Sequence, residues 1–478
     1  MNFRFFKKVA GALAVGLMLA STWAWADTNE RVVARSSPDW LRDGVIYEIF
    51  PRDFSPAGNI NGVTAKLDEL QKLGVNILWL MPIHPIGEKF RLGKFGSPYS
   101  VRDYYAIDPV YGTPGDFKRL VVEAHKRKMK VIMDLVADHT AWDSVMMKHP
   151  GFYKRDAHGK IISPTPDWTD VAALNYANQG LRKYMIGVLK YWVQRYDIDG
   201  FRCDAAAMVP TSFWEQARAQ LGRVKPDIIM LAEASKPELL VNAFDIDYSW
   251  PLLAAEDKVL LAGAPASVIR SSWEDSLARF PRGALHMRIS DDHDEVRAIN
   301  RYGLKGALAM SALMFTLDGV PLVYNGMEIG DAHETSGGGL FKKLNISWQA
   351  PPHPELRAIY HDLIQLRHEY PALCNSRVDW LHNSDETNLL TFLREDDKDE
   401  LLVVINFADH RVSGSVDFAS ANGFAPLKIS GMEDQPDSPL PALHLDGFEW
   451  RIYHRIPNPS RPLTGLHGHK DLNGGNEQ

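Results

Sequence analysis

The chain has 478 residues, enough for a large barrel domain and a smaller second domain. Its composition is that of an ordinary globular protein, with 45% hydrophobic and 24% charged residues. The formal net charge is −7 and the chain contains no long basic run, which argues against nucleic acid as a partner.

The first 26 residues have the pattern of a secretory signal. A basic start at Arg4, Lys7 and Lys8 precedes an apolar stretch at residues 9–20, and residues 24–26 fit the small-x-small cleavage rule. The apolar stretch is short for a bilayer, so we expect cleavage and no stable membrane span afterwards. We therefore expect export to the periplasm or the medium; an uncleaved N-terminal anchor is the alternative.

From residue 45 the chain alternates short apolar segments with amphipathic helices. We predict the first two strands at residues 45–50 and 76–81, joined by a helix that presents Val63, Leu67 and Leu70 on one side and ends at Gly74. Further strands are predicted at residues 130–136, 198–203, 228–232, 244–246, 285–289 and 321–324, and a long helix at residues 181–196. Such repeated units, with polar residues after the strands, predict a (β/α)₈ TIM barrel over residues 37–379, with the active site at its C-terminal face.

Two stretches depart from this alternation. Residues 140–175 follow the third strand, are rich in Pro, Gly, His and Asp, and predict a short inserted subdomain that forms one wall of a cleft. Residues 457–478 are rich in Pro, Gly and Asn and predict a flexible tail. Between the barrel and the tail, a C-terminal antiparallel β-sandwich over residues 380–456 is predicted from short alternating strands at residues 389–393, 401–406, 411–416 and 450–454.

Acidic side chains follow four of the predicted strands, in the segments at residues 134–139, 200–204, 231–233 and 290–294. Isolated carboxylates in such places would lose hydration without a compensating partner. If Asp204, Glu233 and Asp294 converge at one rim, they supply the proton donor and the carboxylate that glycosidic cleavage needs. Taken one at a time, an Arg202–Asp204 structural salt bridge and a helix-capping Glu233 are the simpler interpretations.

The pKa values of the two leading carboxyl groups should differ. Arg202 lies two residues before Asp204 on the same strand, so we expect its guanidinium to lower the pKa of Asp204. Three apolar residues precede Glu233, and we expect this setting to raise its pKa. An ionised nucleophile beside a protonated acid is the combination that a retaining glycosidase uses.

The two cysteines, Cys203 and Cys374, do not provide a disulfide framework. Cys203 directly precedes Asp204 on a strand, so its side chain should point away from the site. We expect a buried, inert thiol and no cysteine catalysis.

The order and the residues of the four segments resemble those of the α-amylase family of glycoside hydrolases. The resemblance spans residues 39–348 and includes two further runs at residues 74–83 and 103–113. It implies retaining cleavage of α-linked glucans or maltooligosaccharides, with Asp204 as nucleophile, Glu233 as acid/base and Asp294 as transition-state stabiliser. It implies no cofactor for the chemistry, and it places substrate contacts at Tyr99, His139, Arg202 and His293.

The chain also departs from the family pattern. Asp138 and Asp292 each stand where the family usually has Asn before a histidine, and Ala173 stands where calcium-dependent members carry Asp. Asp138 is thus a candidate calcium ligand, whereas the missing carboxylate at Ala173 argues against a family-type calcium site. We expect Asp292 to take a supporting position, and its cluster with neighbouring acids to raise at least one pKa. The Lys-His pair that the family often has three residues after the nucleophile is replaced here by Ala207 and Met208. We expect this replacement to change contacts to the leaving group.

The sequence leaves the reaction partly open. A transglycosylase or a trehalose synthase-like isomerase would use the same covalent intermediate, and a non-catalytic carbohydrate-binding protein would use the same barrel. Such non-catalytic members usually lose one of the three carboxylates, and all three are present here. Linkage specificity depends on loops, of which residues 140–175 and 331–340 are the candidates; the glycines at 337–339 predict either a flexible loop or a cleft lid.

Overall fold

A computed structural model describes residues 32–418, 420–431 and 439–457. The predicted secretory signal and, apart from Pro457, the predicted tail lie outside these residues. Among the helices that are described, none is both long and apolar enough to cross a bilayer.

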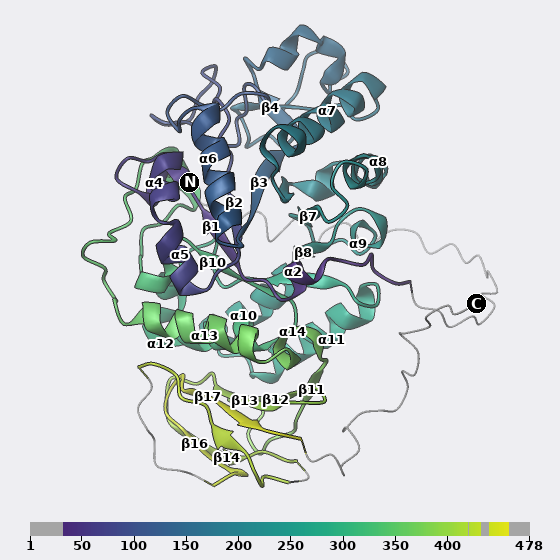
Figure 1. The fold of residues 1–478 in the computed structure, drawn as a ribbon. Coiled ribbons are helices and arrows are strands. Elements are labelled where there is room, and N and C mark those ends of the chain that lie inside the picture. Colours follow the sequence, from purple (N-terminus) through teal and green to yellow (C-terminus); the bar gives the residue numbers. More distant parts are fainter. Residues whose placement is uncertain (1–31, 419, 432–438, 458–478) are drawn as a thin grey trace, which may run out of the picture.

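Eight parallel strands close into a barrel at the centre of the molecule (Figure 1). Their order around the barrel is β1-β10-β9-β8-β7-β6-β3-β2. Nearly all of their residues are buried, because helices cover a sheet of this kind on the outside. The predicted (β/α)₈ barrel is confirmed, with strands β1 (Ile46–Ile49), β2 (Ile77–Leu80), β3 (Lys130–Val136), β6 (Gly200–Asp204), β7 (Ile229–Ala232), β8 (Ile246–Tyr248), β9 (Leu285–Arg288) and β10 (Val320–Tyr324).

The register of the barrel brings the acidic strand ends to one rim. Asp134 of β3 lies opposite Arg202 of β6, and Val136 lies opposite Asp204. Alternate strand residues, such as Trp79 and Leu231, fill the inside of the barrel. Because all eight strands run in the same direction, side chains at their C-terminal ends share one face.

Helices and short turns surround the barrel, and local sequence signals set several of their ends. Thr113 and Asp116 form a capping box at the start of α6, and Gly74 adopts a left-handed conformation (φ 101°) that ends α5. The prediction of a single helix before Gly74 is wrong. Two short helices meet at Lys66 (φ −100°, ψ 1°), which is the C-cap of the first and the N-cap of the second. The α-helices are α2 (Asp39–Arg42), α3 (Pro51–Phe54), α4 (Ile60–Ala65), α5 (Leu67–Leu73), α6 (Pro114–Lys126), α7 (Gln179–Tyr196), α8 (Thr211–Gly222), α9 (Leu239–Asn242), α10 (Trp250–Ala262), α11 (Ser267–Arg279), α12 (Ala298–Thr316), α13 (Leu356–Glu369) and α14 (Ala372–Asn375). The 3₁₀ turns are η1 (Val145–Lys148), η2 (Pro150–Phe152), η3 (Ala206–Met208), η4 (Met327–Ile329) and η5 (Gly337–Phe341), so a 3₁₀ turn occupies the glycine run.

The segment after β3 is a small excursion built around two antiparallel strands, β4 (His139–Ala141) and β5 (Val171–Ala173). The C-terminal sheets lie beside α11, α12 and α14 (Figure 1). Arg394 joins them to the barrel helices, since its Nη1 donates to the carbonyl oxygen of Thr316 at 2.6 Å. The predicted sandwich is confirmed, as a sheet β11-β12-β13-β17-β15 facing a pair β14-β16, with strands β11 (Val378–Trp380), β12 (Leu389–Glu395), β13 (Glu400–Asn406), β14 (Val412–Ser415), β15 (Ala425–Pro426), β16 (Ala442–Leu445) and β17 (Trp450–Arg455).

Candidate active site

The fully buried guanidinium of Arg202 joins three carboxylates at the rim of the barrel. Its Nη1 lies 2.8 Å from Oδ1 of Asp204 and 2.9 Å from Oδ1 of Asp134. Its Nη2 lies 3.0 Å from Oε2 of Glu233. Asp204 and Glu233, predicted as a pair, therefore contact the two terminal nitrogens of one cation, and the Arg202–Asp204 salt bridge is part of this larger cluster.

The turn that follows β6 also holds Glu233. Ala205 adopts a left-handed conformation (φ 43°, ψ 41°), which is uncommon for a residue other than glycine. In this conformation its backbone N–H donates to Oε2 of Glu233 at 2.6 Å. Strain of this kind, placed directly after the candidate nucleophile, is typical of functional sites.

Burial sets the direction of both pKa shifts. It raises the pKa of Glu233 to about 8, with Asp204 and Asp294 adding to the effect and Arg202 opposing it. It also raises the pKa of Asp204, to about 6, although Arg202 works against it. The expected lowering of the Asp204 pKa is thus wrong, because the loss of hydration outweighs the attraction of the guanidinium. Glu233, with the higher pKa, is the weaker acid of the two.

His293 links the third carboxylate to this cluster. Its Nδ1 lies 2.5 Å from Oε1 of Glu48 on β1, and its Nε2 lies 2.7 Å from the hydroxyl of Tyr99 and 3.3 Å from Oδ2 of Asp294. The rings of Tyr99 and His293 are stacked at 5.3 Å. The Asp294 side chain is 56% exposed and so reaches solvent. Although the loss of water opposes ionisation, His293 holds the pKa of Asp294 below its usual value.

The loop that carries His293 and Asp294 is fixed by the acids before them. Asp292 is buried, and its Oδ1 accepts hydrogen bonds from the backbone N–H groups of Asp294 and Glu295 at 2.9 and 3.0 Å. Burial raises the pKa of Asp292 to about 8 and also raises that of Asp291. Asp292 therefore orients the backbone of Asp294 instead of presenting its carboxyl group to the cleft.

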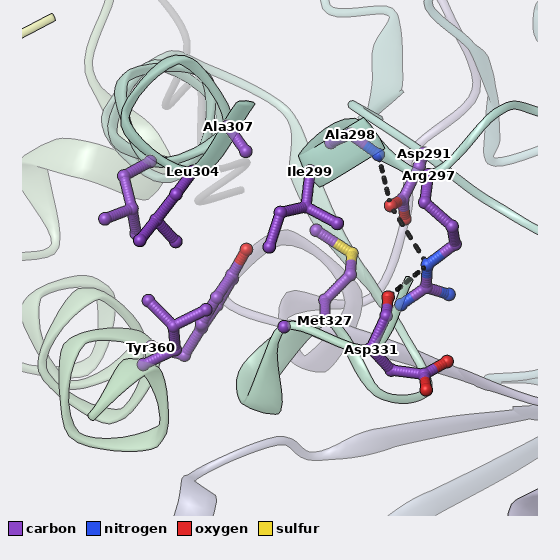
Figure 2. Close-up of a pocket in the computed structure, with 12 residues that line it drawn as sticks. Asp291, Arg297, Ala298, Ile299, Leu304, Ala307, Met327, Asp331 and Tyr360 are labelled. Atoms are coloured by element: carbon purple, nitrogen blue, oxygen red, sulfur yellow. Dashed lines mark hydrogen bonds and ion pairs between the residues drawn. The ribbon is translucent and has the colours of Figure 1, made fainter. Parts of the chain in front are cut away.

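A separate cavity is lined in part by Asp291 and by Arg297 to Ile299 (Figure 2). Asp291 and Arg297 form its polar end, where Oδ2 of Asp291 accepts from the N–H of Ala298 at 2.8 Å and Nε of Arg297 donates to the carbonyl oxygen of Asp331 at 3.1 Å. None of the predicted site residues lines it. The rest of its wall is apolar, with Ile299, Leu304, Ala307, Met327 and Tyr360.

His139 lies close to Asp204, and Asp138 lies beside it. Nδ1 of His139 is 2.8 Å from Oδ1 of Asp138, while its Nε2 donates to the carbonyl oxygen of Tyr99 at 3.1 Å. Burial opposes protonation of His139, but Asp138 raises its pKa to about 9, with Asp204 and Asp170 contributing. An imidazolium therefore lies among these acids.

The same residues allow a test of the calcium site. Ligand atoms of Asp138, His139 and Asp204 lie within 4.8 Å of one another. Oδ1 of Asp138 forms an ion pair with Nδ1 of His139 at 2.8 Å, and its Oδ2 has no hydrogen-bond donor in the described structure. Calcium takes six to eight oxygen ligands, whereas this set has an imidazole and the candidate nucleophile. Opposite His139 on β5 stands Ala173, which has no ligand atom. These three side chains alone offer fewer oxygen ligands than calcium takes, and the nearest group to the Asp138 carboxylate is the imidazole of His139.

Sequence reasoning missed two buried carboxylates that complete the site. Asp134 accepts hydrogen bonds from Arg202 and, through Oδ2 at 3.1 Å, from Tyr99. Glu48 pairs with His293. The sequence did contain a signal for both residues, since each is a lone acid within an apolar strand. Burying such a charge is costly unless a partner is present. Both cysteines are buried and free, as predicted for Cys203.

Comparison with known proteins shows which family the chain resembles. The family model described as "Alpha amylase, catalytic domain" matches residues 24–158 and 166–244. A noncanonic maltogenic alpha-amylase, AmyB from Thermotoga neapolitana, is 31% identical and superposes with a TM-score of 0.80 over 87% of this chain and 100% of its own. Relatives in sequence include the alpha-amylase MalA of Haloarcula japonica, 27% identical over 78% of this chain, and the intracellular maltogenic amylase of Bacillus subtilis, 27% identical over 77%. The chain spans 56% of the length of MalA and 69% of that of the B. subtilis enzyme.

Proposed function

The chain belongs to the α-amylase family of glycoside hydrolases, and from this premise we propose that it is a retaining hydrolase of α-1,4-linked glucans or maltooligosaccharides. Glycosidase activity on α-glucans is common to the relatives named above. The retaining mechanism and the roles of individual residues are our proposal. The observation that carries it is the bridge from Arg202 to Asp204 on one side and to Glu233 on the other.

The proposed reaction has two steps. Glu233 donates its proton to the glycosidic oxygen while a carboxylate oxygen of Asp204 attacks the anomeric carbon, so the leaving sugar departs and a glycosyl–Asp204 ester forms. Glu233, now ionised, takes a proton from water, whose oxygen attacks the anomeric carbon and releases Asp204. Asp294 faces the positive charge that develops on the sugar. Arg202 faces the Asp204 carboxylate that forms again when the ester breaks.

The product profile tests this proposal. Wild-type protein and the Asp204→Asn variant are incubated with soluble starch and with maltoheptaose, and new reducing ends and chain lengths are measured. Hydrolysis by the wild type alone, with the first product an α-anomer by ¹H NMR, supports a retaining enzyme that uses Asp204. Longer or rearranged sugars would instead identify a transglycosylase or an isomerase. Equal activity of the Asp204→Asn variant would overturn the assignment of the nucleophile.

We also propose that the chemistry needs no cofactor and no calcium at Asp138. The donor set around His139 supports this, since its positive charge comes from an imidazolium. The proposed steps use only side chains of this chain and water.

We propose finally that the protein is exported. The basic, apolar and small-residue pattern of residues 1–26 supports export. The B. subtilis relative is named intracellular, so the proposal depends on this chain's own N-terminal sequence. Fractionation of cells that express the full chain, together with N-terminal sequencing of the product, tests it: a cytoplasmic protein with residues 1–26 intact would reject export.

A further inference from the structure

Glu48 is a buried carboxylate in the middle of an apolar strand. It lies on β1 between Tyr47 and Ile49, with no exposed surface. Its Oε1 is 2.5 Å from Nδ1 of His293, and its Oε2 has no hydrogen-bond donor in the described structure. A carboxylate in this position is costly unless the partner that it contacts carries a compensating proton.

The hydrogen bonds around His293 determine which atoms hold protons. A carboxylate only accepts, so the hydroxyl of Tyr99 donates to Oδ2 of Asp134, 3.1 Å away. The same hydroxyl oxygen then accepts from Nε2 of His293, 2.7 Å away. On the other side of the ring, Nδ1 donates to Glu48. With Glu48 and Asp134 both ionised, these contacts are satisfied when His293 carries a proton on both nitrogens.

We propose that Glu48 is a positioning residue that keeps His293 doubly protonated, so that its Nε2–H is a fixed hydrogen-bond donor beside Asp294. The inference rests on the proposed function, because on binding a hydroxyl group of the sugar next to Asp294 would take the place of the Tyr99 hydroxyl as the acceptor of this Nε2–H. Glu48 acts through His293 and does not itself contact the reacting atoms. A hydrogen bond donated by a cation is stronger than one from a neutral ring, which favours a donor of this kind where charge develops.

Other ionisable groups near the ring also affect the pKa values of His293 and Glu48. Although burial opposes protonation, Asp294 and Glu48 raise the pKa of His293 well above its ordinary value. Burial raises the pKa of Glu48, and His293 and Arg202 oppose that shift. The edge of Trp79 packs on the ring at 5.9 Å. The remaining ionisable groups that act on His293 or Glu48 are Asp134, Asp292, Tyr248 and Tyr324.

The Glu48→Gln variant tests the inference, because glutamine has nearly the same shape but no charge. Imidazole resonances are followed by NMR against pH, and His293 is assigned by its loss in a His293→Gln variant. In the wild type we expect His293 to be doubly protonated at pH 7. In Glu48→Gln we expect its titration to move to lower pH by about one to three units, the shift typical of losing one close opposite charge. Where the His293 titration falls below that of Glu233, the alkaline limb of kcat/KM should move to lower pH as well.

Glu328→Gln is the matched control. Glu328 is also fully buried, and its Oε1 accepts from the hydroxyl of Tyr47, the neighbour of Glu48, at 2.7 Å. This variant removes a buried carboxylate next to the same strand without touching His293. We expect its His293 titration and its pH profile to match those of the wild type. Glu48→Gln added to His293→Gln should cause no further loss of activity, since the pair acts as a unit.

Several results would overturn the inference. They are a neutral His293 at pH 7 in the wild type, an unchanged titration in a folded Glu48→Gln variant, or a loss of activity that is equal at all pH values. A neutral His293 in the wild type would overturn the inference even if Glu48→Gln does not fold. A wild type that is inactive on every α-glucan would reject the proposed function, while the NMR titration would still test the ion pair.

Discussion

The Nη2 atom of Arg202 lies 3.0 Å from Oε2 of Glu233. Arg202 is on β6, and Glu233 directly follows the neighbouring strand β7. Adjacent parallel strands place their last side chains within reach of each other, and a planar guanidinium can bind two carboxylates at once. One residue thus fixes the distance between the candidate nucleophile and the candidate acid. A lysine ammonium at this position would be too short and too compact to do so.

Replacing Arg202 with lysine should therefore cost more activity than the retained charge suggests. We expect kcat/KM on maltoheptaose to fall at least about 100-fold, the usual loss when a preorganised donor is removed from an active site. The acid limb of the pH profile should move to higher pH, because burial of Asp204 would be opposed less. Arg288→Lys is the control: this arginine is also buried but pairs with Asp318, away from the site. Similar losses in both variants would contradict a specific role.

The pH dependence of kcat/KM should be bell-shaped. The reactive form has an ionised Asp204, whose pKa is about 6, and a protonated Glu233, whose pKa is about 8. Activity should fall below the lower value as the nucleophile gains a proton, and above the higher value as the acid loses its own. The two limbs belong to the coupled pair. In Glu233→Gln, the remaining activity on an α-glucosyl fluoride, which needs no proton donor, should lack the alkaline limb that Glu233 causes in the wild type. Persistence of that limb would assign it elsewhere.

The barrel could be predicted from the sequence because several buried strands, such as β3, β6 and β7, are largely apolar runs with a polar residue at or just after their end. The run before Asp204 and the run before Glu233 each match a strand to within about two residues, the usual error of such boundaries. The break at Lys66 between two helices could not be predicted, because the apolar spacing of Val63 and Leu67 continues across it. The short strands β11, β15 and β16 were missed since two to four residues carry no clear period.

The site was predictable where acids end strands and unpredictable where a side chain depends on its spatial neighbours. Glu48 lies in the middle of a strand, and only the three-dimensional structure brings it to His293, 245 residues later. The direction of the Asp204 shift was missed for a related reason. Sequence spacing indicates that Arg202 is near, but it does not indicate how completely the pair is removed from water.

Removal of divalent cations should leave the enzyme intact. We expect equal activity and equal Tm after dialysis against EDTA and after calcium is added back, because the positive charge beside Asp138 comes from His139. Thermal unfolding and activity on maltoheptaose measure both properties on the same samples. A fall in Tm on chelation that calcium reverses would show that the chain holds a structural calcium ion.

A buried acid far from the site should make the fold sensitive to pH. Glu256 lies on α10, is 1% exposed, and its Oε2 has no hydrogen-bond donor in the described structure. Burial raises its pKa to about 8 from an ordinary value of 4.5, with Asp257 adding to the effect and Arg288 opposing it. Between these two values the folded protein binds a proton that the unfolded chain releases. The contribution of Glu256 to the free energy of unfolding therefore falls as pH rises through this window and levels off above it.

Glu256→Gln should remove that dependence. We expect the variant to gain stability over the wild type between pH 5 and pH 8, by roughly 3 kcal/mol as an order of magnitude at the linkage of 1.36 kcal/mol per pKa unit. Urea unfolding at both pH values measures the difference directly. Glu274→Gln, at an exposed glutamate on α11 that pairs with Arg270, is the control and should follow the wild type. An equal gap between Glu256→Gln and the wild type at both pH values would mean that Glu256 is already ionised in the folded protein.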